Sequence, residues 1–402
     1  MAGASVTTID NILKEVWTES RVAEQLYQSN PILDRIKKLK NTTTGQQAQT
    51  TVHVGRNEGF SLTSNAGTTA LNAATNQSYA QATWNYKHAH QQVKIDGAAI
   101  DQSSGDVNAL ASVIDEEMTG AVNDLSRKIG MYLQIGSTGY VATCGTTSGS
   151  TTVTLNAADA ANAFKSGWLD VGTVVDIGTA TNEDADVNGE AITAISVANG
   201  TIDVTSSITT DSSDFVTISN TRLNSTSYAP NGLPDIVGTA SFAGVDPATF
   251  SSWKAANVDS TAQALSLSLL YQQNQNVAQK TGKTPTYVVT GLKQQRKAYE
   301  LAQAQVRFAG DSGLGVGSVD SVNINGVNLF GTPDVKNECI WFLTPEDIFT
   351  ISAGDPYWQD KITGGKRLEW QQGYDAYVGK LTYRFNLGCR RRNSHAALTG
   401  LS

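Results

Sequence analysis

The segment from Asn41 to Asp96 constrains this chain most, because it is long and has few residues that could form a hydrophobic core. Its ends have strand patterns, AQTTVHV at residues 48–54 and QATWNYKHAHQQVKID at 81–96, and the residues between are mostly Gly, Ser, Thr, Asn and Ala. Alternation predicts one face of the second strand: Ala82, Trp84, Tyr86, His88 and His90. We therefore expect a long hairpin whose tip has few residues that could pack. Because a lone two-stranded hairpin is marginally stable in water, it needs another surface to rest on.

A single long helix is predicted from Asp106 to Ile135. Apolar residues recur every three or four positions along it and form one stripe: Val107, Leu110, Ile114, Met118, Ala121, Leu125 and Ile129. Ser103 or Ser104 is a candidate N-cap, and Gly136 follows the last turn. At 1.5 Å per residue the helix would span roughly 45 Å, which predicts a rod longer than most small domains are wide.

An amphipathic arm is predicted before the hairpin. Residues 8–30 have helical spacing, and Pro31 suits the first turn of a second helix, ILDRIKKLK, at residues 32–40. An arm this short needs to pack against another surface to be stable.

The stretch from Tyr140 to Asn220 changes to short Val, Ile and Thr strands between Gly, Asn and Asp turns. It contains ten acidic residues and one base, Lys165, a net charge of −9, whereas the whole chain carries −8. We predict a compact acidic β module, which is either a folded spacer or an outward-facing decoration.

Strands and helices alternate from Pro230 to Gly354, which predicts a small α/β domain. Its expected elements are a helix over 261–280 with Ser260 as cap and Gly282 as stop, a buried strand TYVVT, a helix LKQQRKAYELAQ, a hairpin around Asn325-Gly326, and a strand CIWFL that leads into a short turn at Thr344.

The last predicted strand, AYVGKLTYRFNL at residues 376–387, is expected to be half-buried and paired with KRLEWQQG at 366–373. Three arginines follow it: Arg390, Arg391 and Arg392. They could touch nucleic-acid phosphates, or they could pair with acids on another protein chain. We favour a subunit contact, because three bases do not form an extended groove and the rest of the chain is near neutral.

Composition excludes several classes of protein. Charged residues make up only 16%, and neutral polar side chains, which cost less to desolvate, suit contact with other protein. Three separated cysteines do not form a disulfide framework, the N-terminus lacks a signal-peptide pattern, and no run is apolar enough to span a membrane.

Catalytic and metal motifs are weak. The four histidines are scattered; His88 and His90 share a strand face but need a third ligand to hold zinc. GDSG at 310–313 lacks the His and Asp context of a serine protease, and the glycines of GLGVGS miss the spacing of a dinucleotide loop. We therefore expect no enzyme activity and no cofactor.

The order of these parts resembles the major capsid protein of tailed bacteriophages, with the HK97-like fold. The stretches that carry the resemblance are KTPTYVVTGLKQQRKAYELA, INGVNLFGTPDVKNECIWFLTPEDIFTI and RRRNSHAALTG. The resemblance implies an α+β fold with six parts: residues 1–40 as N-terminal arm, 41–98 as extended loop, 99–139 as peripheral domain with a spine helix, 140–225 as an inserted acidic β domain, 226–355 as axial domain, and 356–402 as peripheral strands and tail.

The function that the resemblance implies is self-assembly into pentamers and hexamers that close an icosahedral shell around a double-stranded DNA genome. The implied partners are further copies of the chain, a scaffolding protein, a portal, a decoration protein and DNA bound without sequence preference, with no membrane. Assembly is expected in the host cytoplasm and the mature location in the virion. An encapsulin-like compartment and a phage tail or surface-layer protein are the alternatives.

The extended loop of such relatives lies over a neighbouring subunit, which supplies the surface that the hairpin lacks. We accordingly expect inter-subunit contacts at Trp84, Tyr86, His88, Arg390, Arg391 and Arg392. Lys87 is a candidate for the lysine–asparagine cross-link of some relatives, although no acid near it in the sequence is identifiable as a catalyst.

Overall fold

The computed structural model describes residues 31–40, 47–62, 71–97, 107–182, 185–223, 225–303, 322–324, 326–359 and 368–402. The chain divides into two compact units. Unit 1 comprises Met1–Thr44, Tyr86–Pro230 and Thr350–Asn386, and unit 2 comprises Gly45–Asn85, Asn231–Phe349 and Leu387–Ser402. Each unit is thus assembled from three separate stretches of sequence.

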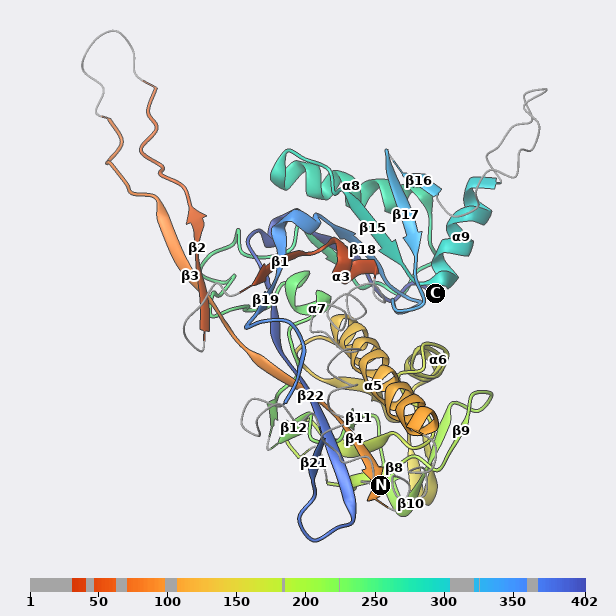
Figure 1. Cartoon of the computed structure of the whole chain (residues 1–402). Helices are drawn as coiled ribbons and strands as arrows, with labels where there is room; N and C mark the ends of the chain where they lie inside the picture. Colours follow the sequence, from red (N-terminus) through yellow and green to blue (C-terminus); the bar gives the residue numbers. More distant parts are fainter. Residues whose placement is uncertain are drawn as a thin grey trace, which may run out of the picture. The chain divides into compact units, whose positions relative to one another are not determined.

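The largest sheet of unit 1 is built around β22 (Ala376–Cys389) (Figure 1). Beside β22 lie β4 (Lys87–Asp96), β19 (Ile348–Ser352), β20 (Tyr357–Trp358) and β21 (Leu368–Trp370), with β1 (Lys37–Lys40) beyond β19. The predicted pairing of residues 366–373 with the last strand is confirmed, because β21 pairs antiparallel with β22. The expectation of a half-buried strand holds only in part: on the face away from Tyr383 and Phe385, Arg384 is exposed, but Thr382 and Asn386 are buried.

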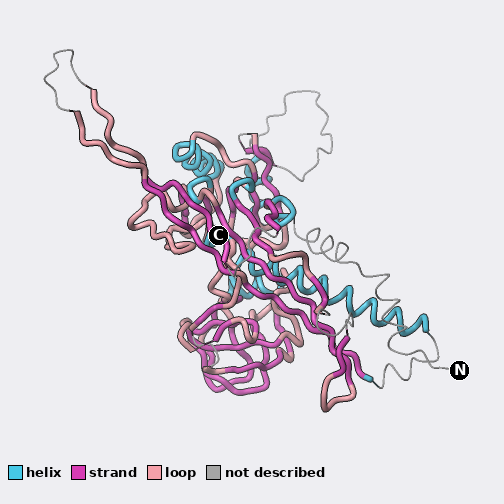
Figure 2. The backbone as a smooth tube through the Cα atoms, turned by 60° about the vertical axis from the view of Figure 1, so that its left-hand side comes forward, coloured by secondary structure: helices cyan, strands magenta, loops and turns pink. Residues whose placement is uncertain are grey.

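The predicted rod is present as α5 (Val107–Ile135), the longest helix in Figure 2. Of its predicted stripe, Met118, Ala121, Leu125 and Ile129 are buried. Gly136 ends the helix with φ 78°, and its N–H donates to the Tyr132 carbonyl. A left-handed φ of this kind is where glycine is preferred, so the predicted stop is confirmed. The candidate caps Ser103 and Ser104 lie outside the described residues.

The arm is described only from Pro31 onward. Pro31 opens the short helix α3 (Pro31–Arg35) as expected, but the predicted helix over 32–40 is wrong beyond Arg35, because residues 37–40 form strand β1. Strand pairing with β19 decides the conformation there, and local helical spacing does not reveal such a partner. The earlier predicted helix, over residues 8–30, lies outside the described residues.

The predicted β module forms two sheets in unit 1. One has the order β5 (Tyr140–Thr143), β11 (Asp214–Ile218), β7 (Val174–Thr179), β8 (Val187–Ala191), and the other has the order β6 (Thr147–Thr154), β10 (Thr201–Thr210), β9 (Ala194–Ser196). Helix α6 (Ala157–Lys165) was not predicted; Asn156 caps it by accepting the Ala158 N–H. A two-stranded ladder of β12 (Arg222–Leu223) and β13 (Thr226–Ser227) follows. Met131 and Ile135 of α5 belong to the same hydrophobic core as the module.

Two of the acids of the module are structural rather than exposed. Asp176 is buried, and its carboxylate accepts the N–H groups of Gly189 and Asn220. Asp214 is buried and accepts the N–H of Asp211. The net charge of this segment therefore overstates the charge on its surface.

Unit 2 contains the α/β part, organised on one mixed sheet. Its strand order is β14 (Asn257–Asp259), β23 (Ala396–Leu398), β18 (Ile340–Leu343), β15 (Tyr287–Thr290), β17 (Val327–Gly331), β16 (Val322–Ile324). Its helices are α7 (Leu233–Ile236), α8 (Leu267–Thr281) and α9 (Leu292–Gln303), with 3-10 turns η1 (Pro345–Asp347) and η2 (Arg392–Ser394). The strand TYVVT, the helix LKQQRKAYELAQ, the β16–β17 hairpin and the strand CIWFL are confirmed, within one residue at their ends.

The predicted cap of α8 is wrong. The cap is Ser266, whose Oγ accepts the Leu269 N–H, and not Ser260, because the helix begins six residues later than its pattern suggested. The predicted stop at Gly282 is confirmed, with φ 75° and an N–H that donates to the Ala278 carbonyl.

The C-terminal tail is placed differently from the expectation that grouped residues 356–402. β23 pairs with both β14 and β18, and Ala396, Leu398 and Leu401 lie in the core of unit 2. The tail is small and apolar because it forms an inner strand of the sheet. The remaining boundaries of the six-part division stay a prediction.

The predicted hairpin is present in unit 2 as β2 (Gln47–Gly55) paired antiparallel with β3 (Ser78–Asn85). Figure 1 shows them as one long two-stranded ribbon. The predicted single strand over 81–96 is divided into two strands at Tyr86. The buried residues are at even-numbered positions before it and at odd-numbered positions after it. Ala82 and Trp84 are buried in β3, whereas Val93 and Ile95 are buried in β4 and His88 is exposed. The expectation of one continuous face is therefore wrong.

Candidate functional site

A pocket of about 340 Å³ in unit 2 is lined by both the arginine triplet and the hairpin. One wall is the second half of β2 and the residue after it, from Thr51 to Arg56. The other wall consists of Ser252, Trp253 and residues 390–393, so segments almost 340 positions apart in the chain enclose one space. Because no Asp or Glu lines it and four of its residues are arginines, the pocket is strongly cationic.

Arg390 is held at the end of β22 by contacts on both sides. Its backbone N–H donates to the Asp347 carbonyl at 2.9 Å, and its guanidinium lies over the Phe349 ring, 5.6 Å from the centroid. Trp84 of β3 packs edge-to-face on the same ring, with centroids 5.2 Å apart. The approach requires glycine at Gly388, because an added Cβ would lie 2.6 Å from the Phe349 ring. The cation is thus positioned by an aromatic stack at the base of the hairpin.

Arg56, Arg390 and Arg391 are exposed. Within the described part of the chain, none of these three side chains forms an ion pair. Guanidinium groups present planar pairs of N–H donors that match carboxylate and phosphate oxygens, so a cluster of three without acids favours an anionic ligand.

Arg392 has a different role from the one predicted. It is 1% exposed, and its guanidinium donates five hydrogen bonds of 2.8–3.0 Å to backbone carbonyls of unit 2: Asp235, Ile236, Gly238, Ala240 and Trp253. Burial lowers its pKa to about 10. The predicted subunit contact at Arg392 is wrong, because its donors are used within the chain.

The predicted contact at Trp84 is wrong for a similar reason. The side chain is 2% exposed and fills the core between β3 and Phe349. Its indole is therefore a packing element that holds the hairpin base, and it has almost no surface to offer to another chain.

Tyr86 and His88 belong to unit 1, so they are not part of the pocket, and their role in subunit contact stays a prediction. His88 and His90 stack at 6.3 Å between ring centroids. Burial, and then nearby cations that include Arg384, lower the pKa of both rings. No group of three possible metal ligands occurs among the described residues.

Other candidates can be placed as well. Lys87 donates from Nζ to the Ser227 carbonyl at 2.9 Å within unit 1. The GDSG and GLGVGS stretches lie outside the described residues. Across the part of the chain that the structure describes, no helix is both long and apolar enough to cross a membrane.

Sequence reasoning missed four residues of this region: Arg56, Ser252, Trp253 and Phe349. One signal was available, because Arg56 is the only Lys or Arg between Asn41 and Tyr86. A single base in a long stretch whose one other charged residue is Glu58 is a candidate for a functional charge. Ser252, Trp253 and Phe349 had no such signal, since only the fold brings them to the arginines.

Comparison with known proteins gives the context for this site. No family model and no curated protein matches the sequence. Among solved structures, the cyanophage A-1(L) capsid asymmetric unit matches with a TM-score of 0.57 at 11% identity, over 92% of this chain and 93% of that one. The chain has the fold of a phage capsid protein.

Further matches are less close in shape. The capsid of the native GTA particle gives a TM-score of 0.47 at 9% identity, covering 94% of this chain and 91% of that one. A chain from Mycobacterium phage Adephagia gives 0.44 at 9% identity, covering 92% and 89%. The predicted α+β, HK97-like fold class is confirmed by the cyanophage match.

Proposed function

We propose that this protein is the major capsid protein of a tailed bacteriophage. The observation that carries the proposal is the full-length match to a cyanophage capsid chain, which covers more than nine tenths of both chains. The low content of charged residues, 16%, supports a surface that is used for contact between proteins.

The proposed assembly consists of pentamers and hexamers that close an icosahedral shell around double-stranded DNA. Scaffolding, portal and decoration proteins are its proposed partners, assembly takes place in the host cytoplasm, and the finished protein is part of the virion. The protein acts as a structural element rather than an enzyme.

The hairpin supports this proposal through its exposed apolar side chains. Phe60, Leu62 and Leu71 are 75%, 86% and 74% exposed on the segments beyond β2 and before β3. Exposed apolar groups together on an extended segment mark a surface that another chain covers. Neighbouring copies in a shell would cover them.

Electron microscopy of the purified protein tests the proposal. We expect closed polyhedral particles, whereas tubes, sheets or monomers under assembly conditions would contradict it. Shells that contain a captured enzyme instead of DNA would support the encapsulin-like alternative.

The exposed arginines provide a second test. We propose that Arg390 and Arg391 contact a neighbouring subunit, so Arg391→Glu should block assembly in the absence of DNA, because it places a carboxylate where an anion is expected. Arg296→Glu, on the exposed face of α9, is the matched control. If the Arg391 variant forms normal empty shells and loses only packaging, the arginines contact DNA.

A further inference from the structure

Among the residues that the structure describes, one edge of β2 has no partner strand. Thr83 of β3 donates its N–H to the Ala243 carbonyl at 2.9 Å, so this N–H points away from β2, and the opposed pair Gln49↔Thr83 is one without ladder hydrogen bonds. Such pairs alternate with hydrogen-bonded pairs along an antiparallel ladder. The backbone N–H and C=O groups of Thr51 and His53 therefore point away from β3.

In the described part of the chain, few groups bond to this edge. Among the described residues, the bond along it is from the Ser252 Oγ to the Val54 carbonyl at 2.8 Å, where the register shifts between His53 and Gly55. A row of unpaired N–H and C=O groups is a template for another strand. Natural proteins rarely leave such an edge uncovered in their working state.

The cationic pocket lies along this same edge. Six consecutive residues, Thr51 to Arg56, line it, and consecutive side chains of a strand point to opposite faces. The pocket therefore follows the strand lengthwise instead of lying over one face. Arg56 follows the end of β2, and Arg390 and Arg391 line the same pocket as the strand.

The arginines and the open strand edge together determine which kind of ligand the pocket favours. Arginine binds carboxylate and phosphate equally well, but a phosphate backbone offers mainly acceptors, which cannot bond the carbonyls of a strand edge. An extended peptide has both donors and acceptors for the edge, and its acidic side chains supply the anions. This combination favours a peptide strand over a nucleic acid.

We propose that the open edge of β2 and the Arg56–Arg390–Arg391 pocket bind an extended, carboxylate-bearing segment of a second copy of this chain. The second copy is favoured because the chain has 37 acidic against 29 basic residues, while the pocket is purely cationic. A two-stranded ribbon is also marginal without a third strand. The proposal rests on the proposed function, since assembly brings the copies together.

Hydrogen–deuterium exchange on the whole chain tests this. We expect the outward-facing amides of Thr51 and His53 to exchange at least about tenfold more slowly in the assembled protein than in the dissociated chain. The double variant Arg390→Gln, Arg391→Gln should abolish that protection, or remain dissociated with an unchanged melting temperature under conditions where the wild type assembles. Arg296→Gln is the matched control and should behave as the wild type.

Three results would overturn the proposal: equal exchange in assembled and dissociated wild type, full protection in an assembled double variant, or protection that appears when a DNA duplex is added to the dissociated chain. Microscopy separates this outcome from the proposed function. Oligomers that protect the edge but never close into shells would contradict the capsid function alone, and closed shells with a freely exchanging edge would contradict this inference alone.

Discussion

Arg391 and Arg392 are neighbours with opposite environments. Arg391 is exposed and lines the pocket, whereas Arg392 is enclosed by five carbonyls of the loop and helix between Asp235 and Trp253. Its guanidinium also lies over the Phe242 ring, 5.1 Å from the centroid. A buried cation without a carboxylate partner is stable here because every donor direction meets a carbonyl.

We predict that Arg392→Lys destabilises the protein by about 3 kcal/mol or more, because an ammonium has three donors and leaves carbonyls unpaired. Arg391→Lys, one position earlier, should change stability by no more than about 0.5 kcal/mol. Denaturant unfolding of the dissociated chain measures both, and equal losses would contradict the structural role of Arg392.

His395 is the other unusual residue of this region. It is 0% exposed, and its Nδ1 accepts the Thr344 N–H at 3.2 Å, which fixes the neutral ring with its proton on Nε2. Nε2 lies 3.4 Å from Ser394 Oγ and 3.5 Å from Cys389 Sγ. Burial, and secondarily the charge of Arg392, lower the pKa of His395 from 6.5 to about 3.

This shift predicts a pH dependence with a definite sign. Between pH 6.5 and about 3, His395 is protonated in the unfolded chain but neutral in the folded chain. The free energy of unfolding should therefore be constant above pH 6.5 with respect to this group and fall by up to ~1.4 kcal/mol per pH unit below it. His395→Gln should reduce that slope in urea titrations at several pH values. A constant offset between variant and wild type at every pH would contradict it.

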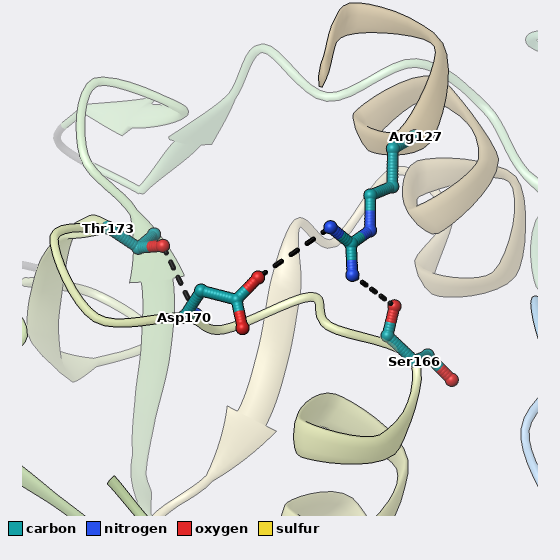
Figure 3. Close-up of polar contacts among 4 residues, drawn as sticks. All are labelled: Arg127, Ser166, Asp170 and Thr173. Atoms are coloured by element: carbon teal, nitrogen blue, oxygen red, sulfur yellow. Dashed lines mark hydrogen bonds and ion pairs between the residues drawn. The ribbon is translucent and has the colours of Figure 1, made fainter. Parts of the chain in front are cut away.

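At the scale of elements, the β module is attached to the rod helix in two ways. Figure 3 shows the polar one: Arg127 of α5 lies 3.7 Å from the Asp170 carboxylate and donates to the Ser166 carbonyl at 3.3 Å. The apolar one is the shared core, to which α5 contributes Met131 and Ile135. Both partners of the ion pair are more than half exposed, so water screens it.

The core should therefore dominate the attachment. We predict that Asp170→Asn costs less than about 1 kcal/mol, as exposed ion pairs do. Met131→Ala should cost about 2–5 kcal/mol, because it leaves a cavity in the core. Thermal unfolding of the dissociated chain compares the two, and a larger loss for Asp170→Asn would show that the ion pair is the main link.

At the scale of the whole molecule, the hairpin is the part that the chain does not complete by itself. Its base is well packed by Trp84 and Phe349, but its far segments expose Phe60, Leu62 and Leu71. One edge of β2 has no partner strand among the described residues. Exposed apolar groups cost free energy in water, and burial recovers about 25 cal/mol per Å². Assembly is the event that would supply this burial.

We accordingly predict that the triple variant Phe60→Ser, Leu62→Ser, Leu71→Ser keeps the melting temperature of the dissociated chain but assembles poorly. The three side chains contribute little to the isolated chain because they are mostly in water already. Sedimentation velocity measures the assembled fraction. Wild-type assembly by this variant would show that the hairpin contacts nothing apolar.

The sequence predicted most where a local pattern is sufficient. The stripe of α5, the glycine that ends it and the strands of the α/β part were read correctly, because helical and strand periods and turn residues act over a few positions. Prediction failed at residues 37–40, at the α8 cap and at Tyr86, where the parity of the long strand changes. At residues 37–40 and at Tyr86, a strand partner far away in the chain decided the local conformation.

By itself the sequence determined the parts of this protein: a long helix, an acidic β module, a mixed α/β part and a hairpin with too few core residues to be stable alone. Only the tertiary structure decided which arginine is free and which is buried, that the tail is an inner strand, and that Arg56 lies in the same pocket as Arg390. The periodicity of apolar residues shows whether one face of a helix or strand is apolar. Burial of a charge and the partners of a strand edge depend instead on contacts between residues hundreds of positions apart.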